Sequence, residues 1–428
     1  MQTFYSHAFG CRVNQAEKEA LDNQLLENGL SFKEENPDVY IINTCSVTHK
    51  AEREAKQLIY QIKRRSPDTK IVVTGCAATN WIKQGVKVDE VDLAVDNKNK
   101  EYLSEIIKKH FNTPVIPSSG RDQDHIKKVD KYLNSGRAIL KIQDGCHRFC
   151  TFCIVPYLRG LPKSTPVEDL VKAVNGLDPS IKEVILSAIN TQAYGFDTKE
   201  PFIKLLHAIM NHTTVERISF GSIHPWSFDE EFFTFYKQHA DSERFVHFFH
   251  IPLQSGCNKI LTLMKRGYTR EEFMEKLQRL STLNPFAYIG TDVIVGFLEE
   301  TEKDFDDTYD FLEKTPISKF HVFRFSQREH TAAHYLARKL QEPTPAEKQK
   351  RAQALISLGK KKYQQFLQKH IGKTFEALLL EQRSGEYQHA LLQNQVPIFI
   401  KTAKDLRGSI QNIRVGEYKD NELIGTVN

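Results

Sequence analysis

The segment AILKIQDGCHRFCTFCIVPYLRG, residues 138–160, joins a strand-like run to a loop with three closely spaced cysteines. Cys146, Cys150 and Cys153 follow one another in the pattern C-x3-C-x2-C. Three thiolates at this spacing suit three irons of a cubane [4Fe–4S] cluster and leave the fourth iron without a protein ligand. A structural zinc site normally takes four protein ligands, and no second cysteine pair follows here. The loop therefore favours an iron–sulfur cluster over zinc.

Upstream of this loop, the chain alternates between β-rich runs and helical stretches. Strands are expected at 3–9, 39–44, 70–75 and 92–97, and helices at about 14–29, 47–65 and 100–110. Such alternation indicates an α/β fold with an open parallel sheet and crossover helices. Cys11, Cys45 and Cys76 each lie just after one of the first three strands. Because the carboxyl ends of parallel strands form the ligand crevice of such sheets, we expect these cysteines to converge at one edge.

Three converging thiolates can hold an iron–sulfur cluster or a metal with one coordination position left open. The alternative is three inert core cysteines, since free cysteine is a common buried residue. The repeated order of strand, small residue and cysteine favours a ligand site. Asn14, three residues beyond Cys11, is expected either to line the same crevice or to cap the first helix.

The composition is that of an ordinary soluble protein, with 428 residues of which 40% are hydrophobic and 26% charged. No run approaches the roughly 18 apolar residues of a membrane span, and the start lacks a signal-peptide pattern, so we expect a cytoplasmic protein without a membrane partner. Seven cysteines, an odd number, fit metal ligation in a reducing compartment better than a disulfide framework. The seventh, Cys257, is expected to be an inert packed thiol.

The net charge is only +5, but the charges are unevenly distributed. Residues 50–70 carry seven Lys or Arg against three acidic residues, and residues 346–370 carry seven against one Glu. Eight acidic residues gather in 299–314. The two basic stretches fit a polyanionic partner, and the alternative is that they are solvated helix faces.

Several longer motifs resemble those of the radical S-adenosylmethionine methylthiotransferase family. They are, in chain order, FGCRVNQAE, NTCSVT, TGCAA, QDGCHRFCTFCIVPYLRG and HIPLQSGCNKILTLMKRGYT. The resemblance spans nearly the whole chain and implies two [4Fe–4S] clusters, with S-adenosyl-L-methionine as a further cofactor. It places the cluster that binds S-adenosylmethionine on Cys146, Cys150 and Cys153. It places an auxiliary cluster, which carries the sulfur to be transferred, on Cys11, Cys45 and Cys76.

The implied reaction inserts sulfur at an unactivated aromatic C–H carbon. Ordinary acid–base catalysis cannot remove the hydrogen from such a carbon. The resemblance implies that S-adenosylmethionine is cleaved to a 5′-deoxyadenosyl radical that removes this hydrogen. A second S-adenosylmethionine supplies the methyl group, and the auxiliary cluster supplies the sulfur. An electron donor such as flavodoxin or ferredoxin and a source of sulfur are therefore implied as partners.

The stretch Gly10–Gln15, GCRVNQ, is most similar to the branch that acts on N6-threonylcarbamoyladenosine next to the anticodon of tRNA. The alternatives are the same chemistry on isopentenyl-adenosine in tRNA or on a ribosomal-protein aspartate. A nonenzymatic iron–sulfur RNA-binding protein is the alternative from a different class. With tRNA as the expected partner, the candidate substrate contacts are Asn14, Lys360, Lys361 and Lys362.

The middle of the chain is expected to form the partial (β/α)6 barrel of the resembled family. Strand-like runs stand at 138–143, 183–189, 217–222, 245–252, 288–296 and 320–325, and helical stretches at 166–175, 228–239, 270–281 and 302–315. Active-site groups of such barrels lie at the carboxyl ends of the strands. The candidate cofactor-binding residues are therefore Asn190, Ser222, His224, Gln254 and Arg266.

Two departures from the family pattern affect the expected S-adenosylmethionine contacts. Ser187-Ala188 stands where members of the family often carry Thr-Gly. Phe297–Thr301 reads FLEET where they commonly read FPGET. Glycines allow the backbone to approach a ligand closely, so the detailed contacts to the cofactor are left open.

Residues 371–428 contain five short strand-like pieces punctuated by glycines, which indicates a small β-barrel. In position and length this module resembles the TRAM domain that holds RNA in the family. Its seven basic and seven acidic residues cancel, and an intramolecular lid is the alternative. The predicted domains are an N-terminal methylthiotransferase domain at 1–112, a linker at 113–136, a radical S-adenosylmethionine domain with a trailing basic helix at 137–370, and the β-barrel at 371–428.

Overall fold

The computed structural model describes residues 3–111 and 136–428, so the predicted linker at 113–136 lies outside the described residues except for its last position. The described chain forms two compact units. The first comprises the residues up to Phe111 together with Asp144–His147 and Cys153–Leu161, and the second comprises the remainder. The domain boundaries proposed from the sequence stay predictions.

The first unit is a parallel five-stranded sheet in the order β2-β1-β3-β4-β5. Its strands are β1 (Thr3–Ala8), β2 (Ser31–Phe32), β3 (Val39–Thr44), β4 (Lys70–Thr74) and β5 (Leu93–Ala94). Its helices are α1 (Arg12–Glu27), α2 (His49–Arg65), α3 (Gly75–Gln84), the short 3-10 helix η1 (Lys100–Tyr102), α4 (Leu103–His110) and α5 (Val155–Arg159). The predicted α/β fold is confirmed, while α3 and β2 were not predicted.

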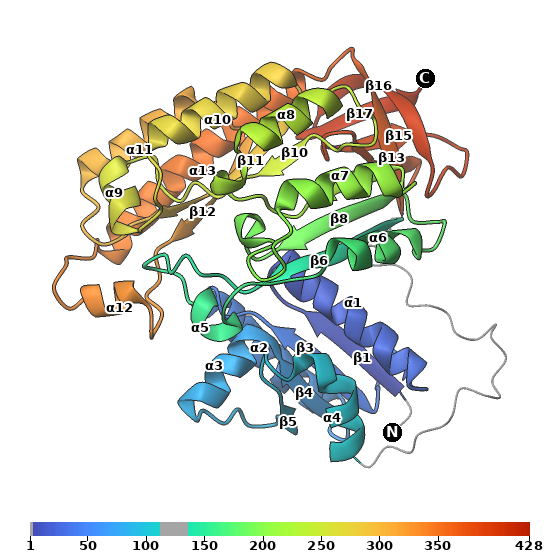
Figure 1. The fold of residues 1–428 in the computed structure, drawn as a ribbon, viewed down its shortest axis with the longest axis vertical. Coiled ribbons are helices and arrows are strands. Elements are labelled where there is room, and N and C mark those ends of the chain that lie inside the picture. Colours follow the sequence, from blue (N-terminus) through green and yellow to red (C-terminus); the bar gives the residue numbers. More distant parts are fainter. Residues whose placement is uncertain (1–2, 112–135) are drawn as a thin grey trace. The chain divides into compact units, whose positions relative to one another are not determined.

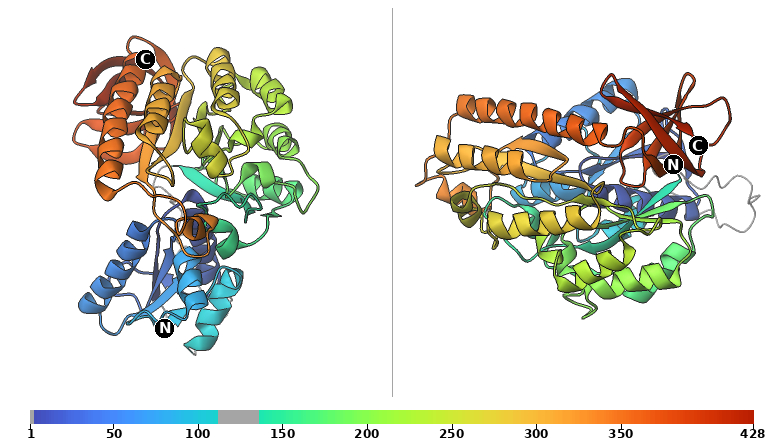
Figure 2. Two further views of the ribbon diagram at one scale, coloured as in Figure 1. Left: turned by 90° about the vertical axis from the view of Figure 1, so that its left-hand side faces the viewer. Right: turned by 90° about the horizontal axis from the view of Figure 1, so that it is seen from above.

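Helices cover both faces of this sheet (Figures 1 and 2). Side chains of successive strand residues point to opposite faces, so the core is divided in two. Ile41 belongs to the apolar cluster that includes α1 and α4, whereas its neighbour Ile42 belongs to the cluster that includes α2 and α3. A strand buried on both faces needs a continuous apolar run, as the first four residues of β3, VYII, provide.

The second unit contains the predicted run of parallel strands with helices packed outside them. Its strands are β6 (Arg137–Asp144), β7 (Lys163–Ser164), β8 (Glu183–Ala188), β9 (Arg217–Phe220), β10 (Phe248–His250), β11 (Tyr288–Val295) and β12 (Lys319–Arg324). They form the sheets β7-β6-β8-β9 and β10-β11-β12, which are joined at a single parallel bridge between Ile218 and Phe245. All six predicted strands of the partial barrel are present.

The helices of this unit are α6 (Val167–Asn175), α7 (Phe202–His212), α8 (Glu230–His239), α9 (Asn258–Leu263), α10 (Arg270–Leu283), α11 (Glu302–Lys314), α12 (Ala332–Leu336) and α13 (Pro345–Gln368), with 3-10 turns η3 (Thr191–Ala193) and η4 (Pro225–Ser227). One apolar cluster fills the space between helices and strands. It takes Leu205 and Ile209 from α7, Phe232 from α8 and Leu277 from α10. Burying each apolar side chain of this kind contributes about 1.5–3 kcal/mol to the free energy of folding.

The end of the chain forms the predicted β-barrel. Its strands are β13 (Thr374–Ser384), β14 (Tyr387–Leu392), β15 (Pro397–Lys401), β16 (Ile410–Lys419) and β17 (Glu422–Val427), and they close in the order β13-β14-β15-β17-β16. Full closure removes exposed strand edges. Ile398, Ile400 and Leu423 fill the interior and are at most 1% exposed.

Buried polar contacts dock this barrel against the amino ends of the preceding strands. Arg217, the first residue of β9, is fully buried and donates hydrogen bonds to the carbonyls of Leu391 (3.1 Å) and Leu392 (2.9 Å) on β14. The side chain of Gln393 donates to the carbonyl of Phe245 at 3.1 Å, just before β10. Active-site groups lie at the carboxyl ends of such strands. The barrel packs against the amino ends instead, so it does not form an intramolecular lid over those groups.

Glu376 on β13 provides a test of this docking. Burial, together with the nearby carboxylates of Glu243 and Glu216, raises its pKa to about 7. Between pH 4.5 and 7 the folded chain therefore holds a proton that the unfolded chain has lost, so stability falls as the pH rises through this window. Glu376→Gln is expected to raise Tm by a few degrees at pH 8 and to change it little at pH 5, measured by scanning calorimetry.

The exposed Glu422 on β17 provides the matched control. Glu422→Gln removes a carboxylate from the same barrel and is expected to leave Tm unchanged at both pH values. An equal change in Tm for Glu376→Gln at pH 5 and pH 8 would contradict the account.

Candidate functional site

Cys11, Cys45 and Cys76 lie just beyond the carboxyl ends of β1, β3 and β4. These strands end at the same level, because Ala8 pairs with Asn43 and Asn43 with Thr74. The loop after β1 touches the second cysteine, since a Cβ atom on Gly10 would stand only 2.7 Å from Cys45 Sγ. The thiols of Cys11, Cys45 and Cys76 also lie within electrostatic reach of one another. The structure thus places the three cysteines at one edge of the sheet.

Within the described residues, no three His, Cys, Asp or Glu side chains are gathered closely enough to hold a single metal ion. A [4Fe–4S] cluster has a different requirement, because each thiolate binds a separate iron at a corner of the cube. The three thiols, one beyond the end of each of three adjacent strands, suit a group that each of them binds at a separate iron.

Burial sets the chemistry of these thiols in the metal-free chain. It raises the pKa of Cys45 to about 12. Cys11 is exposed as a residue, but the protein atoms around its sulfur raise its pKa as well, and the guanidinium of Arg159 opposes this rise. Cys11 and Cys45 therefore stay protonated at neutral pH until a metal displaces the protons, as thiolate ligation requires.

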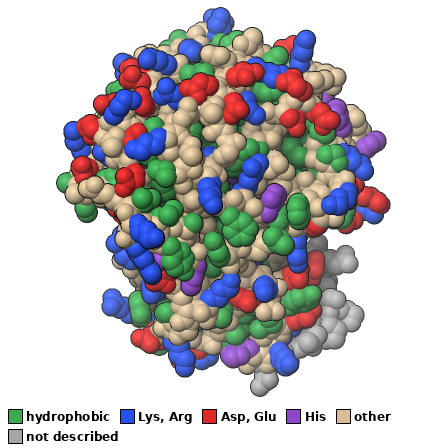
Figure 3. All heavy atoms as spheres, turned by 60° about the vertical axis from the view of Figure 1, so that its left-hand side comes forward, with side chains coloured by type: hydrophobic (Ala, Val, Ile, Leu, Met, Phe, Trp, Pro, Cys, Tyr) green, Lys and Arg blue, Asp and Glu red, His purple; other side chains and the backbone are tan. Residues whose placement is uncertain are grey.

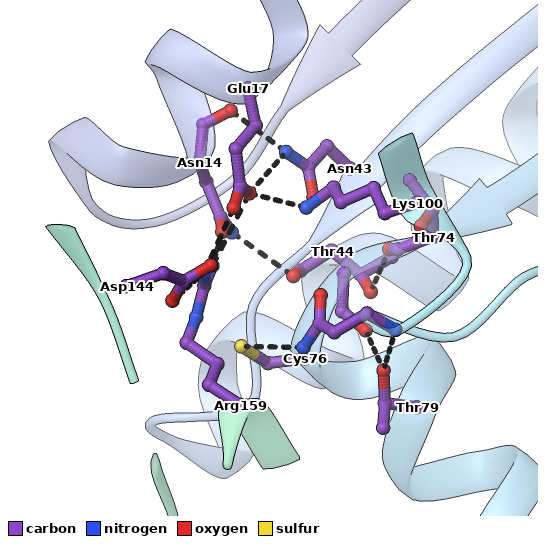
Figure 4. A network of polar contacts seen from close by, with 12 residues as sticks. Asn14, Glu17, Asn43, Thr44, Thr74, Cys76, Thr79, Lys100, Asp144 and Arg159 are labelled. Atoms are coloured by element: carbon purple, nitrogen blue, oxygen red, sulfur yellow. Dashed lines mark hydrogen bonds and ion pairs between the residues drawn. The ribbon is translucent and has the colours of Figure 1, made fainter. Parts of the chain in front are cut away.

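A buried network of charged and amide side chains lies beside Cys76 (Figure 4). At its centre is Arg159, the last residue of α5, whose side chain is 1% exposed. Its guanidinium donates to Glu17 at 2.9 Å, to Asp144 at 2.8 Å and to Asn14 Oδ1 at 2.6 Å. Lys100 forms a second ion pair with Glu17. Two cations thus face two carboxylates in this network.

Asn14 links this network to the cysteine loops. Its amide donates to the carbonyl of Phe9 at 2.8 Å and to that of Thr44 at 3.1 Å, while its oxygen accepts from Arg159. It does not cap α1, because Cys11 precedes that helix and no side chain caps it. The structure therefore has Asn14 holding two loops together, and its contact with tRNA stays a prediction.

Sequence reasoning missed Arg159 and Glu17. A signal for Glu17 was present, since it follows Val13 and precedes Leu21 at a spacing of four residues on the buried side of α1. A carboxylate on such a stripe needs a buried partner. No sequence pattern around Arg159 indicates that it supplies the positive charge that pairs with Glu17.

Cys146, Cys150 and Cys153 fall in the loop between β6 and α5, as predicted. Cys150 is buried, and Arg266 donates a hydrogen bond to its sulfur at 3.3 Å. The same guanidinium donates to Tyr268 Oη at 3.0 Å and to the carbonyl of Pro252 at 3.0 Å. Arg266 is thus a neighbour of a predicted cluster ligand, and its direct contact with S-adenosylmethionine stays a prediction.

The other candidates in the second unit stand at the carboxyl ends of strands. Asn190 follows β8, and its side chain accepts from the backbone of Gln192 at 3.2 Å. Ser222 follows β9 and is half-buried. Gln254 follows β10 with a left-handed backbone, φ 77°, held by its hydrogen bond to the carbonyl of Asp292 at 2.9 Å. A non-glycine residue held in this conformation is more common at functional sites than elsewhere.

His224 stands in an aromatic and cationic cluster. Its ring stacks on Trp226 at 6.0 Å, and the guanidinium groups of Arg148 and Arg266 lie 4.0 and 4.7 Å from that indole ring. Burial, with Arg266 nearby, lowers the pKa of His224 to about 3, so the imidazole is neutral at physiological pH. Trp226 was not singled out from the sequence, since one tryptophan beyond a strand has no distinguishing spacing.

The two departures from the family pattern have local structural roles. Ser187 and Ala188 end β8 and are both buried. Glu299 adopts φ 59°, the conformation that glycine takes most easily, and Glu300 forms a buried ion pair with Arg351 of α13 at 2.9 Å. This segment ends at Thr301, which caps α11.

The basic helix α13 is partly neutralised by the protein itself. Lys348 and Arg351 are buried and paired with Glu342 and Glu300. Lys362 donates to the carbonyl of Thr315 at 2.7 Å, just beyond the end of α11. Lys360 and Lys361 are exposed.

Charges of both signs are interspersed on the face shown in Figure 3, which agrees with the small net charge. On this face a polyanion would therefore be held by local groups of Lys and Arg rather than by a uniformly basic surface. In the described part of the chain, no helix has the length and apolar character that crossing a membrane requires.

The chain is similar to known families and proteins over most of its length. Residues 3–96 match the Uncharacterized protein family UPF0004, and residues 140–312 match the Radical SAM superfamily. The "Threonylcarbamoyladenosine tRNA methylthiotransferase MtaB" of Aquifex aeolicus is 39% identical over 87% of this chain and 92% of its own. The protein of the same name from Bacillus subtilis is 32% identical over 97% and 94%. A "tRNA-2-methylthio-N(6)-dimethylallyladenosine synthase" of Sulfurovum is 30% identical over 97% of both chains.

Among solved structures, the cobalamin-dependent S-adenosylmethionine radical enzyme OxsB covers 78% of this chain and 54% of its own, with a TM-score of 0.45 and 14% identity. The sequence relatives, which match over almost the full length of both chains, carry the assignment. The chain belongs to the tRNA methylthiotransferase family of radical S-adenosylmethionine enzymes.

Proposed function

We propose that this chain adds a methylthio group to C2 of N6-threonylcarbamoyladenosine in tRNA. The observation that carries the proposal is the 39% identity, over nearly all of both chains, to a protein named for this reaction. Relatives named for the dimethylallyladenosine reaction are 30–31% identical over similar lengths. Isopentenyl-adenosine is therefore the second candidate substrate.

As a radical S-adenosylmethionine enzyme, the chain uses S-adenosylmethionine and a [4Fe–4S] cluster. We assign this cluster to Cys146, Cys150 and Cys153, and a second cluster to Cys11, Cys45 and Cys76. When bound, the first cluster would supply the electron that cleaves S-adenosylmethionine to methionine and a 5′-deoxyadenosyl radical able to remove the hydrogen on C2, and the second would supply the sulfur. The thiol-only donor sets, at a short loop and at three strand ends, support both assignments.

The protein's own part in this chemistry is to hold the ligands in place. Thr151, next to Cys150, donates its backbone N–H to the carbonyl of Met264 at 3.1 Å and its hydroxyl to that of Leu263 at 2.9 Å. Its carbonyl accepts from Ala333 at 2.7 Å. Together with the Arg266 hydrogen bond to Cys150, these contacts fix the middle of the triplet loop.

The proposed tRNA contacts are the exposed cations of α2 and α13. On α2 the exposed cations are Lys50, Arg53, Arg64 and Arg65, and on α13 they are Lys350, Lys360 and Lys361. Such side chains bind phosphates without reading sequence. Flavodoxin or ferredoxin as electron donor, a source of sulfur and a cytoplasmic location belong to the same proposal.

The substrate assignment is tested with purified, reconstituted enzyme and two tRNAs. One carries N6-threonylcarbamoyladenosine and the other isopentenyl-adenosine, and the nucleosides are analysed by mass spectrometry. We expect the methylthio product on the first tRNA at least tenfold faster than on the second. The reverse preference would contradict the proposal.

The same assay tests the cluster assignment through variants. Cys150→Ala is expected to abolish 5′-deoxyadenosine formation, because the triplet then lacks its middle ligand. Cys257→Ala, which removes a buried cysteine outside both ligand sets, is expected to retain it. Undiminished 5′-deoxyadenosine formation by Cys150→Ala would refute the assignment of this cluster.

The auxiliary site is tested by a glycine pair. A Cβ on Gly10 would lie 2.6 Å from Cys45 Cβ, so Gly10→Ala must displace that cysteine. Gly85 has a similar positive φ, 65° against 88°, but no atom within 4 Å of its Cβ position. Gly10→Ala is expected to lower the iron content from about eight to about four atoms per chain, whereas Gly85→Ala keeps about eight. Equal iron in both variants would argue against a cluster at the strand ends.

A further inference from the structure

Arg159 is a buried cation of the first unit. The proposed function gives its charge no role. It stands six residues after Cys153 in the sequence, and its guanidinium belongs to the buried network beside Cys76 (Figure 4). The amide of Asn97 donates both to Cys76 Sγ at 3.7 Å and to the carbonyl of Leu158, the residue before Arg159, at 3.2 Å. A fixed positive group therefore faces a site that becomes strongly negative when three thiolates form.

The geometry around Arg159 prevents this charge from moving away. Its side chain is 1% exposed, and both of its terminal nitrogens are engaged. Nη1 donates to Glu17 at 2.9 Å and to both oxygens of Asp144 at 2.8 and 2.9 Å, while Nη2 donates to Asn14 at 2.6 Å. Only the planar fork of a guanidinium reaches these acceptors together.

The contact with Asn14 carries this fixed position to the cysteine loops. Asn14 donates to the carbonyls of Phe9 and Thr44, which lie two residues before Cys11 and one residue before Cys45. Arg159 thus holds the loops mechanically through Asn14 and faces their sulfurs electrostatically.

We propose that Arg159 is a positioning residue for the auxiliary cluster, which stabilises its thiolate ligands and sets its reduction potential. The inference rests on the proposed assignment of that cluster to Cys11, Cys45 and Cys76. Net charge near a cluster is one of the quantities that determine its potential. A nearby positive charge favours the reduced form, which carries one more electron.

The test isolates the auxiliary cluster in the full chain. Replacing Cys146, Cys150 and Cys153 by Ala removes the other proposed cluster, so the remaining iron reports on the auxiliary site. In this background we expect Arg159→Gln to lower the equilibrium constant for reduction of the cluster at least tenfold. This corresponds to a reduction potential about 59 mV lower for a one-electron couple. The potential is measured by a redox titration followed by electron paramagnetic resonance.

Arg159→Lys separates charge from geometry. It keeps the positive charge but loses the fork, so we expect a potential close to that of the parent and a faster loss of iron to a chelator. Arg351→Lys and Arg351→Gln are the matched controls, because Arg351 is a buried arginine paired with Glu300 in the second unit. Neither control is expected to move the potential or the rate of iron loss.

The outcomes distinguish this inference from the proposed function. If the background chain holds no cluster, both the auxiliary assignment and the role of Arg159 fall. If it holds a cluster whose potential and iron loss are unchanged in Arg159→Gln, the role of Arg159 alone is overturned. Failure of Arg159→Gln to retain iron, with circular dichroism unchanged, supports the inference.

Discussion

Parallel pairing of β1, β3 and β4 is the constraint on which the rest of the proposed chemistry depends. In a parallel sheet each crossover helix returns the chain to the same starting edge, so every strand ends at the opposite edge. Cysteines 34 and 31 residues apart in the sequence are brought together in this way. The second unit uses the same arrangement, since Cys150 follows β6 and Gln254 follows β10. In each unit, the proposed cluster ligands and cofactor-binding residues follow the carboxyl ends of the strands.

Each set of cysteines also has one buried arginine, but the two arginines act differently. Arg266 donates directly to the sulfur of Cys150, whereas Arg159 reaches the cysteine loops through Asn14 and acts on the thiols by its charge. Burial keeps Cys11 and Cys45 protonated without metal, so a cation that stabilises the thiolates makes metal ligation more favourable. In the second unit, Arg217 anchors the C-terminal barrel at the amino end of β9. The barrel therefore does not pack on the carboxyl ends of these strands through this contact.

Much of this organisation could be predicted because its signals are local. Strand-like runs followed by a small residue and a cysteine placed the three cysteines at one edge, and the five strands of the C-terminal barrel were each visible as a short run. Helix α3 was missed because it begins directly at the end of β4 without a separating loop. The charge network was missed because Arg159, Glu17 and Lys100 meet only in the folded chain. Lys362, predicted as an RNA contact from its charge, donates to backbone carbonyls near the end of α11, which no pattern along α13 indicates.

Nucleoside mass spectrometry of tRNA from a deletion strain shows whether this chain methylthiolates threonylcarbamoyladenosine in tRNA. We expect 2-methylthio-N6-threonylcarbamoyladenosine to disappear and its precursor, which lacks the methylthio group, to accumulate. The methylthio form of isopentenyl-adenosine is predicted to stay at its normal level. The intact chain restores the lost nucleoside, whereas a chain with Cys45→Ala does not. Unchanged tRNA, or loss of the isopentenyl derivative instead, would contradict the account.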